Sequence, residues 1–75
     1  MAEWTEEQEE RIRRIVEPVL DVRYARIREK RLSVLEGQVE DLLDKSRKRS
    51  TESAQWRKEA SLLREAIRRI KEAES

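Results

Sequence analysis

A heptad repeat of mostly apolar residues between Leu32 and Ile70 constrains the fold of this chain more than any other feature. Read in alternating steps of three and four residues, the repeat passes through Leu32, Leu35, Val39, Leu42, Ser46, Arg49, Ser53, Trp56, Ala60, Leu63, Ile67 and Ile70. A helix with such a stripe exposes apolar surface to water unless a second helix covers it. The sequence therefore predicts an all-α protein whose long helices form a coiled coil.

Composition narrows the classes of function. The 75 residues are 47% charged and only 36% hydrophobic, which suits helices that bury a narrow stripe better than a globular core. The chain has neither Cys nor His, so disulfides, thiolate or imidazole metal sites and the commonest catalytic base are excluded. We therefore expect a non-catalytic protein with no cofactor, no metal and no small-molecule substrate.

The sequence also bears on location. No apolar run reaches the length of a membrane span, and the first residues are acidic and lack the apolar core of a signal peptide. We expect a soluble, intracellular and cytoplasmic protein with no membrane partner. Its small size also suits an accessory protein of a phage or another virus, including a virion component.

The N-terminal segment, residues 1–17, is predicted to be a capped amphipathic helix. Thr5 and Gln8 have the spacing of a capping box, in which each side chain bonds to the backbone of the other. One apolar face is formed by Ile12, Ile15, Val16, Val19 and Leu20. Pro18 lacks an N–H and is expected to kink or break the helix. Residues 18–75 are then expected to form one long helix that carries the heptad repeat at 32–70.

The polar middle of the repeat, residues 46–53, has two interpretations. It is either a hydrated stretch of one continuous helix, or the bend of an antiparallel helical hairpin whose second helix is capped by Ser50 or Thr51. A bend usually contains Gly, Asn or Pro, and none of these follows Gly37. We favour the continuous helix and keep the hairpin as the alternative.

Charges beside the repeat favour a parallel homo-oligomer. In a parallel coiled coil, position g of one helix meets position e of the next heptad on its partner. The attractive pairs predicted between helices are Arg31–Glu36, Glu52–Arg57 and Glu59–Arg64. Residues 31–36 also resemble the R-h-x-x-h-E motif of parallel trimeric coiled coils.

The apolar members of the repeat are the predicted contact residues of that oligomer, and we call them the seam: Leu32, Leu35, Val39, Leu42, Trp56, Ala60, Leu63, Ile67 and Ile70. The expected partner is a second copy of the chain, as a trimer or dimer, or another helical protein. The predicted function is oligomerisation or scaffolding through helix–helix contacts.

Two basic segments, residues 23–31 and 45–49, give an alternative function. The first leads directly into the heptads and resembles the basic region of a basic leucine zipper, although the chain has no Asn to read bases and Arg49 interrupts the repeat. The predicted phosphate contacts are Arg23, Arg26, Arg28, Arg31, Lys45, Arg47, Lys48 and Arg49. This alternative is a helical protein that binds nucleic acid.

Overall fold

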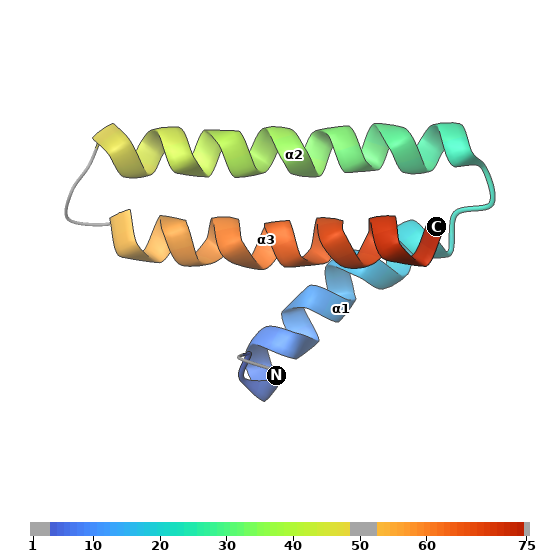
Figure 1. Ribbon diagram of the computed structural model, residues 1–75, viewed down its shortest axis with the longest axis horizontal. Coiled ribbons are helices and arrows are strands. Elements are labelled where there is room, and N and C mark those ends of the chain that lie inside the picture. Colours follow the sequence, from blue (N-terminus) through green and yellow to red (C-terminus); the bar gives the residue numbers. More distant parts are fainter. Residues whose placement is uncertain (1–3, 49–52, 75) are drawn as a thin grey trace.

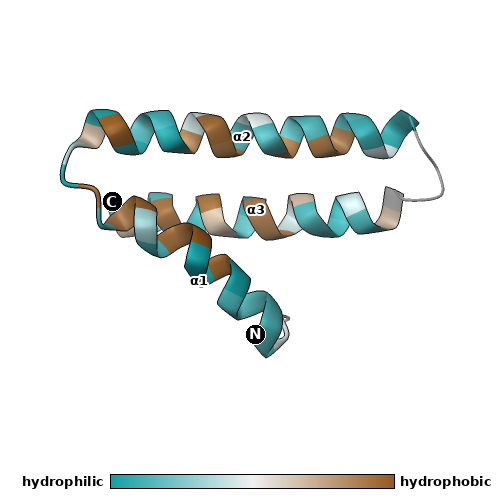
Figure 2. Ribbon diagram, turned by 180° about the vertical axis from the view of Figure 1, so that it is seen from behind, coloured by the Kyte–Doolittle hydropathy of each residue, from teal (hydrophilic) through white to brown (hydrophobic). Residues whose placement is uncertain are grey.

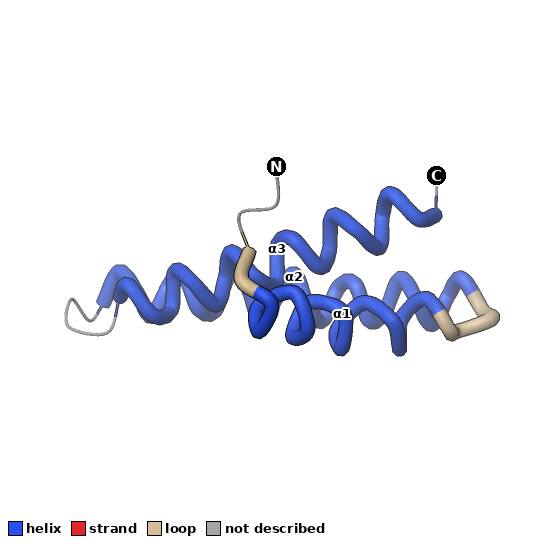
Figure 3. The backbone as a smooth tube through the Cα atoms, turned by 90° about the horizontal axis from the view of Figure 1, so that it is seen from below, coloured by secondary structure: helices blue, strands red, loops and turns tan. Residues whose placement is uncertain are grey.

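The computed structural model describes residues 4–48 and 53–74, and these residues form three α-helices and no strand (Figure 1). The helices are α1 (Glu6–Leu20), α2 (Ala25–Lys48) and α3 (Ser53–Glu74). Helices α2 and α3 lie side by side and run antiparallel, and α1 crosses α3 obliquely. The joint between α1 and α2 lies at the same end of the bundle as the C-terminus (Figure 3). The all-α prediction is confirmed.

Helix α1 begins with the predicted capping box. The Gln8 backbone N–H donates to Thr5 Oγ1 at 3.2 Å, and the Thr5 backbone N–H donates to Gln8 Oε1 at 3.0 Å. Acidic residues in the first turn also suit the positive end of the helix dipole. The start of α1 is therefore determined by local sequence.

Helix α1 continues past Pro18, so the predicted break does not occur there, and the alternative of a kink stays a prediction. The helix includes Pro18 and ends at Leu20, and the Asp21 N–H donates to Glu17 O at 3.0 Å. Pro18 lies in the last turn of α1, and the helix ends two residues after it. The boundary after α1 is therefore residues 21–24, and the long helix predicted for 18–75 starts only at Ala25.

The chain then reverses direction, as in the hairpin alternative. Helix α2 ends at Lys48 and α3 returns beside it from Ser53, while residues 49–52 lie outside those described. The two halves of the seam are joined by a short link, so pairing them within one chain requires little loop-closure entropy. The continuous helix that we favoured is thus replaced by two antiparallel helices. The parallel dimer or trimer is not shown by this fold and stays a prediction.

The core of the bundle surrounds α3, which is buried on two sides. One side carries the buried seam residues Ala60 and Ile67, and Ile67 lies beside Val39 of α2; Ile70 is also fully buried. The other side carries Leu62 and Ala66, which are 2% and 0% exposed. Figure 2 shows the hydrophobic residues gathered where α1 crosses α3 and along the inner side of α2. The rest of the core comprises Ile12, Val16, Val19, Leu32 and Val39.

Candidate functional site

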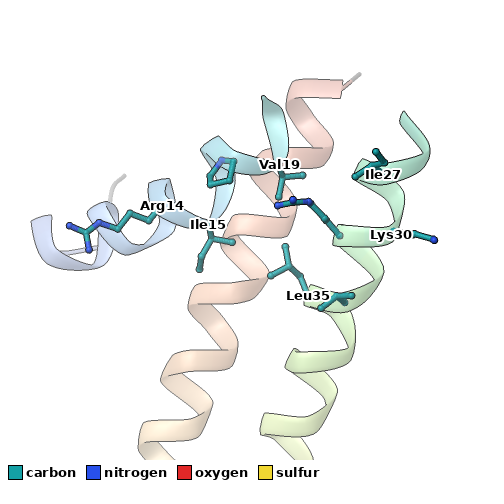
Figure 4. A pocket seen from close by; sticks show the side chains of 9 residues that line it. Arg14, Ile15, Val19, Ile27, Lys30 and Leu35 are labelled. Atoms are coloured by element: carbon teal, nitrogen blue, oxygen red, sulfur yellow. The ribbon is translucent and has the colours of Figure 1, made fainter. Parts of the chain in front are cut away.

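An apolar groove lies between α1 and the N-terminal half of α2. It has a volume of about 540 Å³ and is lined by Arg14, Ile15, Pro18, Val19, Ile27, Lys30, Arg31, Val34 and Leu35. Figure 4 shows Ile15, Val19, Ile27 and Leu35 turned towards the hollow from the two helices. The apolar walls of this groove therefore come from two helices that diverge from one joint.

The groove exists because α1 packs on α3 and makes few contacts with α2. Ile27 and Val34 on α2 consequently remain 43% and 60% exposed. Large hydrophobic side chains this exposed occur, among the residues that the structure describes, only at Leu20, Tyr24, Ile27 and Val34. All of these belong to the joint or to the two helices beside the groove. Contiguous apolar exposure of this kind marks binding surfaces more often than scattered single residues do.

The charged side chains that line the groove are all basic. Arg14 stands on the α1 wall, and Lys30 and Arg31 stand on the α2 wall. In Figure 4 the Arg14 and Lys30 side chains point away from the hollow on opposite sides. Arg14 is only loosely held, since its Nη2 lies 3.4 Å from Glu10 Oε1 and both side chains are exposed. The groove thus has an apolar lining, which we call its floor, and a basic edge on each side, formed by Arg14 on α1 and by Lys30 and Arg31 on α2.

Two sets of ion pairs join α1 to α3, outside the lining of the groove. The two Nη atoms of Arg11 donate to Glu59 at 2.6 Å each. Arg69 donates to Glu9 at 2.7 and 3.0 Å and to Glu65 at 2.8 Å. Hydrogen bonds from Arg69 and Arg11 lower the pKa of Glu9 and of Glu59, respectively, from their ordinary value. These bidentate pairs join α1 to α3 beside the buried apolar contact of the two helices.

The predicted seam is occupied within the single chain. Leu32, Val39, Ala60, Ile67 and Ile70 are buried. The partly buried seam residues that pack against this core are Leu35, Leu42 and Leu63, while Trp56 is partly exposed. Leu62 and Ala66, which sequence reasoning missed, face α1, because the residues at 59 and 69 on the same helix face contact α1. In the sequence, this second buried side is indicated by the adjacent apolar pairs Leu62–Leu63 and Ala66–Ile67, which make the apolar stripe wider than the seam alone.

Two of the residues predicted to form ion pairs between chains are paired within the chain, and the pairs between chains stay a prediction. Glu59 is bound to Arg11, and Glu36 lies 3.2 Å from Lys71 of α3. Arg31 lines the groove, Arg57 and Arg64 are exposed, and Glu52 lies outside the described residues. The partners differ from the predicted ones because α2 and α3 of one chain pack antiparallel, whereas the prediction assumed parallel helices from two chains.

The predicted phosphate contacts do not form one patch. Arg23 and Arg26 are exposed at the start of α2, and Arg28 lies 3.5 Å from Glu74. At the opposite end of α2, Lys45 and Arg47 are exposed, Lys48 lies 3.2 Å from Asp44, and Arg49 is outside the described residues. The two segments are separated by most of the length of a helix of roughly 36 Å. Nucleic-acid binding stays a prediction, with each segment acting alone.

The described residues offer neither a metal site nor a membrane span. Within residues 4–48 and 53–74, no group of three or more His, Cys, Asp or Glu side chains is placed to hold a metal ion. None of the helices described for those ranges combines the length and apolar character of a membrane span. Comparison with protein-family models, curated proteins and solved structures finds no match for the chain. The groove is therefore the surface on which a functional proposal can be built.

Proposed function

We propose that this protein is a non-catalytic helix-packing module that acts in protein assembly by binding a helix of another chain in the groove between α1 and α2. The observation that carries the proposal is the exposure of Ile27 and Val34 on the floor of an apolar groove. Covering an aliphatic side chain that is about half exposed contributes roughly 1 kcal/mol. A helix that covers both side chains and contacts Ile15 and Leu35 would gain a few such increments, which suits a reversible scaffold.

The spacing of the wall residues suits a helix as the ligand. Ile27 and Val34 are two turns apart on α2, and Ile15 and Val19 are one turn apart on α1. An amphipathic helix presents apolar residues at i, i+3, i+4 and i+7, which matches this spacing on both walls. The same helix–helix physics that predicts a coiled coil from the seam thus supports docking at a different surface.

Two carboxylates, those of Glu9 and Glu59, act in the packing of α1 on α3. Glu9 and Glu59 are paired with arginines that lower the pKa of each, so both stay ionised near neutral pH and are poor general acids. They also lie at the α1–α3 contact rather than in the groove. No other role than holding the helices together is needed for them.

A neutral helical peptide tests the proposal. The probe is a stapled, fluorescently labelled amphipathic helix with a leucine stripe and Gln on its other faces, and the assay is fluorescence anisotropy against the full chain. The double variant Ile27→Gln, Val34→Gln should weaken binding by about tenfold or more, because roughly 1.4 kcal/mol corresponds to tenfold. The control Ser33→Gln changes an exposed position of α2 that does not line the groove and should leave binding unchanged.

Two outcomes would contradict the proposal. The first is that the peptide does not bind the wild-type chain at any concentration at which it remains soluble. The second is that the groove variant binds as well as Ser33→Gln does. Circular dichroism of each variant shows whether the helices are retained, and they are expected to be, since Ile27 and Val34 contribute little buried area.

A further inference from the structure

The two basic edges of the groove identify the chemistry of its occupant. We infer that the groove takes an amphipathic helix from a different protein, in which the aliphatic stripe is flanked on both sides by Glu or Asp. This inference rests on the proposed function and adds the class of partner. Its basis is the lining itself, where Arg14 stands on one wall and Lys30 and Arg31 on the other.

The geometry places the charges where a docked helix would need its acids. The apolar side chains Ile15, Val19, Ile27 and Leu35 turn towards the hollow, and Arg14 and Lys30 extend outward on opposite sides (Figure 4). A helix whose stripe meets the floor has its flanking positions above these two edges. Carboxylates at those positions would meet a guanidinium or an ammonium on each side, whereas lysines there would meet like charge.

A second copy of this chain fits the groove less well. Two grooves packed face to face around a twofold axis would bring the basic edges of both copies together. Of the exposed large hydrophobics among the described residues, Ile27 and Val34 line the groove and Leu20 and Tyr24 lie near the joint of α1 and α2, so a folded copy offers no other aliphatic stripe to insert. The seam is not available either, because most of it is buried inside the chain.

The groove also differs from a surface that binds nucleic acid. Phosphate contacts require exposed cations and have no use for an apolar floor. Exposed cations are present at Arg23 and Arg26, outside the groove lining. These two arginines therefore serve as controls, since they lie on the same segment and carry the same charge as Lys30 and Arg31.

The test compares three stapled helices with the same leucine stripe and with Glu, Gln or Lys at every flanking position. Each peptide is about 18 residues, or roughly 27 Å, long. Fluorescence anisotropy against the full chain at low and at physiological salt gives the affinities. Exposed ion pairs contribute about 0.2–1 kcal/mol each, so three of them should make the Glu peptide bind about tenfold more tightly than the Gln peptide. The Lys peptide should bind most weakly, and the preference should shrink at higher salt.

Charge-neutralising variants locate the preference. Lys30→Gln with Arg31→Gln should reduce the advantage of the Glu peptide by about three- to tenfold. Arg23→Gln with Arg26→Gln removes the same charge from the same segment and should change that advantage less than about twofold. Amide chemical-shift changes on adding the Glu peptide should centre on Ile15, Ile27 and Val34.

Each contrary outcome has a separate meaning. Equal affinities for the Glu and Gln peptides would overturn the inference and leave the proposed function standing, while failure of all three peptides to bind would remove the proposed function itself. An equal loss in the two double variants would show diffuse attraction of the kind that nucleic acid exploits, and would overturn the inference. A peptide-free dimer that Ile27→Gln, Val34→Gln dissociates would overturn it in favour of a second copy.

Discussion

Leu62→Ala distinguishes the three-helix bundle from a coiled-coil rod. Leu62 is 2% exposed, and it lies on the side of α3 that faces α1 rather than on the seam. In the heptad register Leu62 falls at position c, which faces solvent in any coiled coil built on the seam. The two architectures therefore predict opposite results for one substitution.

The expected magnitude follows from burial. Replacing a buried Leu by Ala removes its transfer free energy and leaves a cavity, at a cost of about 2–4 kcal/mol. With a urea m-value of about 1 kcal/mol/M for so small a domain, the unfolding midpoint should fall by roughly 2 M or more. A position exposed in the native state would shift the free energy of unfolding by no more than about 0.5 kcal/mol.

The assay is urea unfolding followed by circular dichroism at the helix band, with sedimentation to establish the oligomeric state of each variant. Leu63→Ala is the reference, because Leu63 packs against the core in the bundle and lies on the seam in the rod. Val34→Ala is the control for an exposed aliphatic side chain. If Leu62→Ala is as mild as Val34→Ala while Leu63→Ala is severe, α1 does not cover this side of α3 and the bundle is refuted.

Three further predictions concern local features. Gly37→Ala should raise the free energy of unfolding by about 0.5–1 kcal/mol in the urea assay, because Gly37 lies within α2 and a Cβ there meets nothing within 4 Å; a loss would mean that this part of α2 is not helical. Thr5→Ala should lower that free energy by about 1 kcal/mol through loss of the cap, with a matching loss of helix signal. Acidification below pH 4.5 should weaken the α1–α3 contact, because the pKa of Glu9 and of Glu59 is lower in the folded state than in the unfolded state. The stability that these two carboxylates contribute is therefore present above the ordinary pKa of 4.5 and is lost as the pH falls through the folded-state pKa. Glu9→Gln with Glu59→Gln should flatten this pH dependence in a denaturation series, and an unchanged profile would show that these pairs do not stabilise the fold.

Features determined by local spacing could be predicted from the sequence. The capping box of Thr5 and Gln8 needs only residues within one turn, and the all-α class follows from periodicity over the whole chain. All seam residues except Trp56 lie in or against the core, since apolar periodicity marks a buried face whichever helix covers it. Periodicity carries no direction, however, and so it did not distinguish antiparallel from parallel packing.

Features that depend on distant residues could not be predicted in the same way. The burial of Leu62 and Ala66 requires a third helix, and only the widening of the apolar stripe at Leu62–Leu63 hints at it. The groove depends on the direction of α1, which packs on α3 through buried apolar residues and the pairs Arg11–Glu59 and Arg69–Glu9. Glu59 has no basic residue three or four positions away on its own helix, and no local rule selects Arg11, which is 48 residues away in the sequence.

Return of the chain on itself is the central claim, because it occupies the seam and leaves the groove free. The sequence has no Cys, so spin labels can be attached through Ala25→Cys and Ala73→Cys, at exposed positions near the contact of Arg28 with Glu74. Pulsed electron–electron double resonance should give a short distance between the two spin labels. That distance should be unchanged when the labelled protein is diluted with unlabelled chain. A continuous helix would separate the labels by about 70 Å. That separation, or a short distance that disappears on dilution, would contradict the three-helix bundle.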